Sequence, residues 1–160
     1  MSDVIVPYTV ASKPGQRTGG VVRQFMQDFG DPGAAVAFEP ARLVGALRAG
    51  LSIGELEDLQ SSLQIPMERL APILGISKAT LHRRKATGRL DPAESDRVVR
   101  FARLMGQAVR VLESEASARQ WLSSPQHGLG GAIPLEFAET EVGAREVEQL
   151  LGRIEHGVYS

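Results

Sequence analysis

Apolar residues recur at three- and four-residue spacing along most of the chain, which is the period of a helix with one buried face. The longest such stretch covers residues 91–112, where Asp91 and Glu94 supply an acidic start and Pro92 fits the first turn. Its stripe consists of Val98, Phe101, Ala102, Met105, Val109 and Leu112. We expect this helix to span the molecule and to connect its parts.

Shorter helices are predicted on both sides of it. Upstream, Ser52 and Glu55 have the spacing of a capping box, in which Ser52 accepts from the third helical N–H and Glu55 reaches back to the cap. A second short helix follows and ends at Gly75. Downstream, helices are expected at residues 115–122 and 140–157. No strand pair is evident, so the predicted fold class is all-α.

The composition is typical of a folded, soluble protein. The 160 residues are 42% hydrophobic and 23% charged, close to globular averages. There is no cysteine, which excludes disulfides and thiolate metal ligands. No apolar run approaches the roughly 18 residues that a membrane span needs. We expect a cytoplasmic protein.

The net charge of −1 conceals three differently charged segments. Residues 1–66 carry 5 basic and 7 acidic side chains, residues 67–110 carry 10 and 4, and residues 111–160 carry 3 and 8. A cationic centre predicts a polyanionic partner, and an anionic end predicts a different, basic partner.

The cationic centre has the order of a helix-turn-helix motif. Ala71 is small where the two helices would cross, and Gly75 can adopt the left-handed turn. Ile76 and Leu81 can anchor the second helix to a core. Pro72 departs from a standard motif, because it removes a backbone donor and is expected to kink the first helix.

The second helix of this pair is strongly basic, which favours DNA as the partner. The residues expected to face base edges are Ser77, Lys78, Ala79, His82 and Arg83. Those expected to contact phosphates are Arg84, Lys85 and Arg89, with Arg97, Arg100 and Arg103 extending the positive face. The alternative is an ordinary solvated basic helix, since most charge runs are solvated.

The last third of the chain has a distinctive order of residues. It runs from Ala118-Arg119-Gln120-Trp121-Leu122 through Pro125 and Gly130-Gly131-Ala132-Ile133-Pro134-Leu135 to Thr140-Glu141-Val142-Gly143 and Leu150-Leu151-Gly152-Arg153-Ile154-Glu155-His156-Gly157-Val158-Tyr159. This order resembles the toxin-binding domain of the Xre/MbcA/ParS antitoxins, and residues 51–112 look like their helix-turn-helix part. The chain is therefore divided into an N-terminal arm with one possible helix at 1–45, a DNA-binding domain at 46–112 and a toxin-binding domain at 113–160.

The resemblance implies a type II antitoxin that neutralises a RES-domain toxin, an enzyme that depletes NAD. Such antitoxins form homodimers, cover the toxin's active-site entrance and bind their own operator DNA with the toxin. Trp121 and Pro134 match positions that shape the toxin-binding domain. Thr140 and Gly143 match the start of the last helix, where Gly143 can admit another backbone.

The acidic end of the chain would complement a toxin cleft that holds the phosphates of NAD. The expected toxin contacts are Glu148, Arg153, Glu155, His156, Tyr159 and Ser160. The alternative for this end is a stabilising helix with a frayed tail.

No catalytic or cofactor chemistry is evident in the sequence. His82, His127 and His156 have no metal-ligand spacing. The glycine-rich residues 128–131 lack a third glycine at the spacing that a nucleotide loop requires, and no strand precedes them. We expect neither enzyme activity, nor a metal, nor a cofactor. The alternative function is a stand-alone transcription regulator whose C-terminal domain serves only dimerisation.

Overall fold

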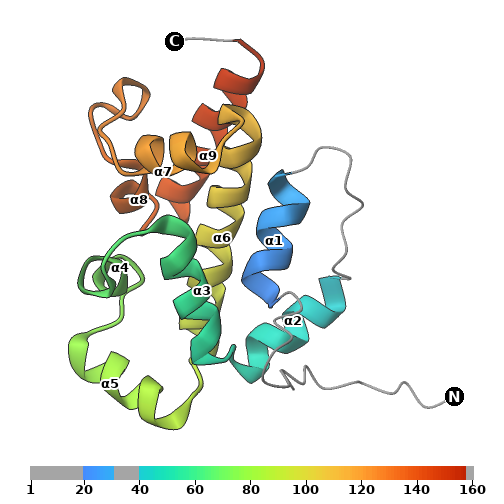
Figure 1. Ribbon diagram of the computed structural model, residues 1–160, viewed down its shortest axis with the longest axis vertical. Helices are drawn as coiled ribbons and strands as arrows, with labels where there is room; N and C mark the ends of the chain where they lie inside the picture. The colour runs from blue at the N-terminus through green and yellow to red at the C-terminus, as the bar shows by residue number, and fades with distance from the viewer. Residues whose placement is uncertain (1–19, 31–39, 158–160) are drawn as a thin grey trace, which may run out of the picture.

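The computed structural model describes residues 20–30 and 40–157, and these ranges are helical with no strand (Figure 1). The elements are α1 (Val21–Gly30), α2 (Pro40–Ala49), α3 (Ile53–Leu63), α4 (Met67–Ile73), α5 (Lys78–Thr87), α6 (Pro92–Leu112), α7 (Glu115–Leu122), the 3-10 helix η1 (His127–Leu129), α8 (Pro134–Phe137) and α9 (Glu141–Glu155). The expected all-α fold is confirmed.

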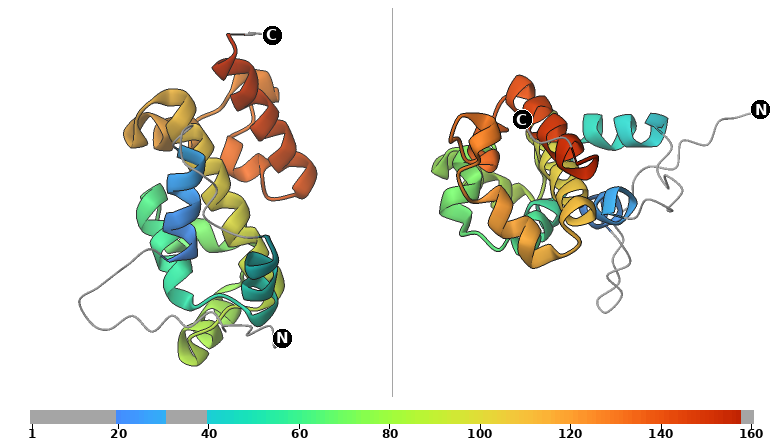
Figure 2. Two further views of the ribbon diagram at one scale, coloured as in Figure 1. Left: turned by 90° about the vertical axis from the view of Figure 1, so that its right-hand side faces the viewer. Right: turned by 90° about the horizontal axis from the view of Figure 1, so that it is seen from above.

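The long helix α6 is the axis of the molecule (Figures 1 and 2). Asp91 Oδ1 accepts from the backbone N–H of Glu94 at 2.7 Å, and Glu94 Oε1 accepts from the N–H of Asp91 at 2.9 Å. This capping box fixes where α6 begins. Because α1, α3, α7 and α9 all pack against α6, the predicted spanning role is confirmed.

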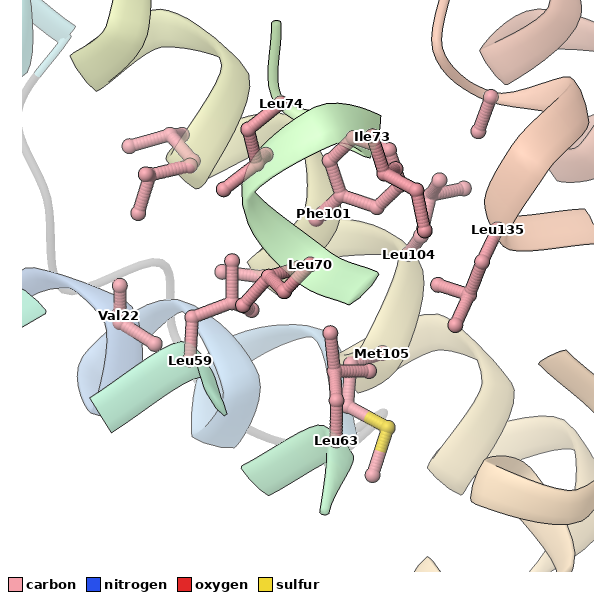
Figure 3. Packing of buried hydrophobic residues seen from close by; sticks show 14 of the residues in the cluster. Val22, Leu59, Leu63, Leu70, Ile73, Leu74, Phe101, Leu104, Met105 and Leu135 are labelled. Atoms are coloured by element: carbon pink, nitrogen blue, oxygen red, sulfur yellow. The ribbon is translucent and has the colours of Figure 1, made fainter. Parts of the chain in front are cut away.

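One hydrophobic cluster continues through both halves of the chain. Figure 3 shows Leu59 and Leu63 of α3 and Leu70 of α4 beside Met105 of α6, with Leu135 of α8 on the far side. Truncating a buried leucine in such a core costs about 2–5 kcal/mol. The helix-turn-helix region and the C-terminal helices therefore stabilise each other.

The possible helix in the predicted N-terminal arm exists as α1, and it belongs to the core. Val21 and Val22 are 1% and 0% exposed, and they pack with α1 against α6. A further helix, α2, was not predicted, and the expected boundary at residue 45 falls inside it. The remainder of the predicted arm, residues 1–19 and 31–39, lies outside the described residues.

The predicted capping box at Ser52 is wrong. Ser52 precedes α3, but its side chain makes no cap hydrogen bond. Glu55, which is 2% exposed, turns to the start of α1 instead, where its carboxylate accepts from the backbone N–H groups of Val21 and Val22, both at 2.9 Å. A buried helix start has N–H groups without intrahelical partners, so a carboxylate from another helix caps it.

Candidate functional site

Helices α4 and α5 are joined by a tight turn that begins at Leu74. Gly75 has a φ of +69°, and its N–H donates to Pro72 O at 3.0 Å. The N–H of Ile76 donates to Ala71 O at 2.8 Å. These two bonds form a Schellman motif, which needs a left-handed residue at its centre. The predicted role of Gly75 is confirmed.

Pro72 lies inside α4, one residue before its end. Because proline has no backbone N–H, it cannot donate to Glu68 O, and α4 lacks that helical hydrogen bond. Ala71 and Ile76 are 4% and 2% exposed, as expected of residues that hold the two helices together. Leu81 is partly buried and packs against the core.

Helix α5 exposes most of its surface, and none of its residues is fully buried. Ser77 is its cap, because Ser77 Oγ accepts from the N–H of Thr80 at 3.1 Å. The residues from the predicted set that are exposed are Ser77, Lys78, Ala79, His82, Arg83, Lys85 and Arg89. Lys78 and Lys85 have no ion pair in the part of the chain that the structure describes.

Arg84, by contrast, is bound within the molecule. Its Nε donates to Glu94 Oε1 at 2.7 Å and its Nη2 donates to Asp91 Oδ2 at 3.3 Å. The hydrogen bond to Glu94 raises the pKa of Arg84, against a smaller opposing effect of desolvation, and the charges of Glu94 and Asp91 add to the increase. Arg84 thus connects α5 to the cap of α6.

Arg89 lies just beyond α5 and reaches the end of α2. Its Nη1 donates to Ala49 O at 3.3 Å and to Gly50 O at 3.0 Å. Arg89 also forms an isolated antiparallel bridge with Ser52. These contacts place the C-terminal ends of α2 and α5 beside each other.

The expectation that α6 extends the basic face is wrong for Arg100 and Arg103, whose charges are paired with carboxylates. Arg97 Nη1 donates to Leu74 O at 3.0 Å. Arg100 Nη2 lies 3.4 Å from Glu141 Oε2, and Arg103 Nε lies 2.8 Å from Glu148 Oε1. These arginines bind the turn before α5 and helix α9, because α6 is covered by other elements on the side where they project.

The C-terminal helices are closely packed at α8 and α9. Thr140 Oγ1 accepts from the N–H of Gly143 at 3.0 Å, which confirms the predicted cap. A Cβ at Gly143 would overlap the carbonyl group of Phe137, so the predicted close approach of a second backbone is also confirmed. Trp121 is partly buried against the core and Pro134 is buried at the start of α8, in agreement with their expected structural roles.

The predicted toxin contacts have different environments. Glu148 and Glu155 are paired with Arg103 at 2.8 Å and Arg110 at 3.2 Å. His156 is exposed just after α9. Arg153 Nε is buried and has no hydrogen-bond partner among the described residues. The other two expected contacts, Tyr159 and Ser160, lie outside the described residues.

Two exposed hydrophobic residues of this region were missed by the sequence reasoning. Val142 is 72% exposed at the start of α9, and Phe137 is 38% exposed at the end of α8. Helical spacing could have marked Val142 as exposed, because it lies away from the apolar stripe of α9. Within the described ranges, no group of three or more His, Cys, Asp or Glu is arranged to hold a metal ion, and no helix is long and apolar enough to cross a membrane.

Two family models match the chain in succession. The antitoxin Xre-like helix-turn-helix domain matches residues 42–103, and the antitoxin Xre/MbcA/ParS C-terminal toxin-binding domain matches residues 107–157. The junction between them falls inside α6, which contributes to both.

Curated relatives agree with this assignment. Antitoxin Xre of Yersinia enterocolitica is 38% identical over 120 residues, which cover 74% of this chain and 81% of that protein. Antitoxin Xre of Photorhabdus laumondii is 34% identical over 71% of this chain and 78% of that protein. The Prs ADP-ribosylating antitoxin of a Sphingobium species is 26% identical over 76% and 82%. The chain therefore belongs to the Xre/MbcA/ParS family of antitoxins, with a helix-turn-helix domain followed by a C-terminal toxin-binding domain.

Proposed function

We propose that the chain is a type II antitoxin that neutralises a RES-domain, NAD-depleting toxin by covering the entrance to its active site. The observation that carries this proposal is the match of residues 107–157 to a toxin-binding domain, placed directly after a helix-turn-helix domain. The name of the Sphingobium relative refers to ADP-ribosylation, a reaction in which NAD is the donor. That name supports a toxin whose substrate is NAD.

The proposed toxin surface is the C-terminal end of α9 with the residues that follow it. It comprises Glu148, Arg153, Glu155, His156, Tyr159 and Ser160. The negative charge that this surface offers to a toxin cleft is smaller than the sequence suggests. The carboxylates of Glu148 and Glu155 are already paired with arginines of α6.

The second proposed activity is binding of operator DNA by α5, in a homodimer. Exposure and unpaired charge support base contacts by the outward N-terminal half of α5 and phosphate contacts by Lys85 and Arg89. Arg84 is left out of the proposed contacts, because Asp91 and Glu94 hold its guanidinium. Helix α5 and the end of α9 lie at opposite ends of the molecule (Figure 1), so one chain has room for both partners.

We propose that the chain acts by binding alone, in the cytoplasm, without a cofactor. Its relatives are antitoxins. The competing function is a stand-alone transcription regulator whose C-terminal domain serves only dimerisation.

Deletion of residues 158–160 tests toxin binding separately from DNA binding. If the tail reaches the toxin, the deletion weakens inhibition of NAD consumption and leaves operator binding intact, because α5 lies at the opposite end of the molecule from the end of α9 (Figure 1). Inhibition that is unchanged by the deletion contradicts the role of the tail. The conservative control is Tyr159→Phe, which keeps the length and the ring and removes only one hydroxyl.

A further inference from the structure

Helix α2 carries two arginines and no acidic residue. Arg42 and Arg48 are exposed, whereas Ala46 is buried and Leu43 and Leu47 pack against the core. The helix therefore presents its apolar side inward and both guanidinium groups outward. Neither arginine has an ion pair with any residue that the structure describes.

This helix lies at the same end of the molecule as α5 (Figures 1 and 2). The backbone N–H of Ile53 donates to Gly88 O at 2.9 Å, and the N–H of Leu90 donates to Leu51 O at 2.8 Å. Together with the two bonds from Arg89 to the end of α2, these contacts fix the segment after α2 to the segment after α5. The positions of the two helices are thus coupled.

Arg89 also changes the electrostatics of the end of α2. The last carbonyl groups of a helix carry a partial negative charge, which would repel a phosphate. Arg89 donates to Ala49 O and Gly50 O and so offsets this charge. Arg42 and Arg48 are six residues apart, about 9 Å along the helix axis at 1.5 Å per residue. Arg89 therefore connects the basic helix α5 to the end of α2.

We propose that α2 is a second DNA contact, in which Arg42 and Arg48 bind backbone phosphates beside the bases that α5 reads. The inference rests on the proposed DNA-binding function and extends it to Arg42 and Arg48, which were not among the DNA contacts expected from the sequence. Phosphate contacts of this kind fix the register of a reading helix without specifying sequence. A second copy of the chain is a poorer occupant, because a two-fold contact across α2 would bring like charges together.

The test compares three variants of the full chain with the unsubstituted chain. Arg42→Ala/Arg48→Ala removes two positive charges from α2. Arg145→Glu changes the net charge by the same amount at a side chain on α9 that is 70% exposed. Arg42→Lys/Arg48→Lys retains the charge. Binding is titrated at several salt concentrations with two duplexes of equal length, one from the promoter of the chain's own gene and one of scrambled sequence.

We expect the double alanine variant to lower the slope of log K against log salt by about 3.6 for a bound homodimer, which loses four phosphate contacts at about 0.9 each. The decrease should be equal on both duplexes, so the ratio of their affinities stays unchanged. The lysine variant should retain the slope of the unsubstituted chain, and Arg145→Glu should lie close to it.

Three results overturn the inference. An unchanged slope in the double alanine variant shows that α2 is not in contact with DNA. An equal loss in Arg145→Glu shows a general effect of net charge. A changed oligomeric state in sedimentation, with the slope retained, assigns α2 to a contact between copies. If the unsubstituted chain binds neither duplex, the proposed DNA-binding function itself fails, and the inference fails with it.

Discussion

Arg103 on α6 donates its Nε–H to Oε1 of Glu148 on α9 across 2.8 Å. Two similar pairs accompany it, Arg100 with Glu141 at 3.4 Å and Arg110 with Glu155 at 3.2 Å. The three acidic residues are spaced by seven along α9 and so share one face of that helix. The cationic centre and the anionic end of the sequence therefore neutralise each other in part.

The Arg103–Glu148 pair should behave as a structural contact and not as a DNA contact. A double-mutant cycle with Arg103→Ala and Glu148→Ala should give a coupling free energy of about 0.5–1 kcal/mol in urea unfolding, as for a partly exposed pair. Arg103→Ala should also leave duplex affinity and its salt dependence unchanged. A coupling near zero, or a reduced salt slope, would contradict this assignment.

Substitution of the adjacent residues Arg83 and Arg84 should affect different properties, namely DNA binding for Arg83 and stability for Arg84. Arg83 is exposed, and its Nη2 donates to Thr80 Oγ1 at 3.1 Å. We expect Arg83→Ala to reduce operator binding by about 1–3 kcal/mol and to relax its specificity, with little change in stability. The measurement is a titration of operator and mismatched duplexes, paired with urea unfolding.

Arg84→Ala should mainly lower the stability of the fold. Its removal leaves Glu94, which is 4% exposed, without its guanidinium partner, and an unpaired buried charge is strongly unfavourable. The urea midpoint should fall, and duplex binding at temperatures where the chain stays folded should change less than in Arg83→Ala. Normal stability together with lost DNA binding would contradict this structural role and indicate that Arg84 contacts phosphates.

Glu55 should be needed for the attachment of α1. Glu55→Ala leaves the N–H groups of Val21 and Val22 without acceptors, at a cost of about 1–3 kcal/mol for each buried donor. Amide hydrogen exchange should then accelerate more in α1 than in the other helices. Glu57→Ala, at an exposed position on the same helix, is the control. Similar exchange in both variants would show that the carboxylate does not hold α1.

Two glycines of α9 provide a matched pair. Gly143→Ala places a Cβ against the backbone of Phe137, so α8 and α9 must separate and the chain should lose stability. Gly152 has no atom within 4 Å of such a Cβ, and alanine is favoured there by about 0.5–1 kcal/mol in a helix interior. Thermal unfolding should show a decrease for the first and an increase for the second. A neutral Gly143→Ala would argue against the tight contact.

The sequence predicted the elements whose signals are local. α6 begins where Asp91 and Glu94 indicated, and the turn at Gly75 needs only the residues around it. The partner of Glu55 was not predictable, since Val21 and Val22 lie more than 30 residues away in the chain. A capping box and a tertiary cap use the same residue types, and only packing decides between them.

The candidate site shows the same division. Exposure of α5 followed from its lack of an apolar stripe, which is a local property. The roles of Arg97, Arg100 and Arg103 did not follow, because a spacing of three spreads side chains over about 120° of a helix surface. Which part of that arc α9 covers depends on the whole chain.

The most direct test of the central claim is co-purification of the full chain with a RES-domain protein encoded beside it, followed by measurement of NAD consumption. The proposed function predicts one stable complex that consumes no NAD, and release of activity when the complex is dissociated. Absence of any complex, together with tight binding of promoter DNA by the chain alone, would contradict toxin neutralisation and favour the stand-alone regulator.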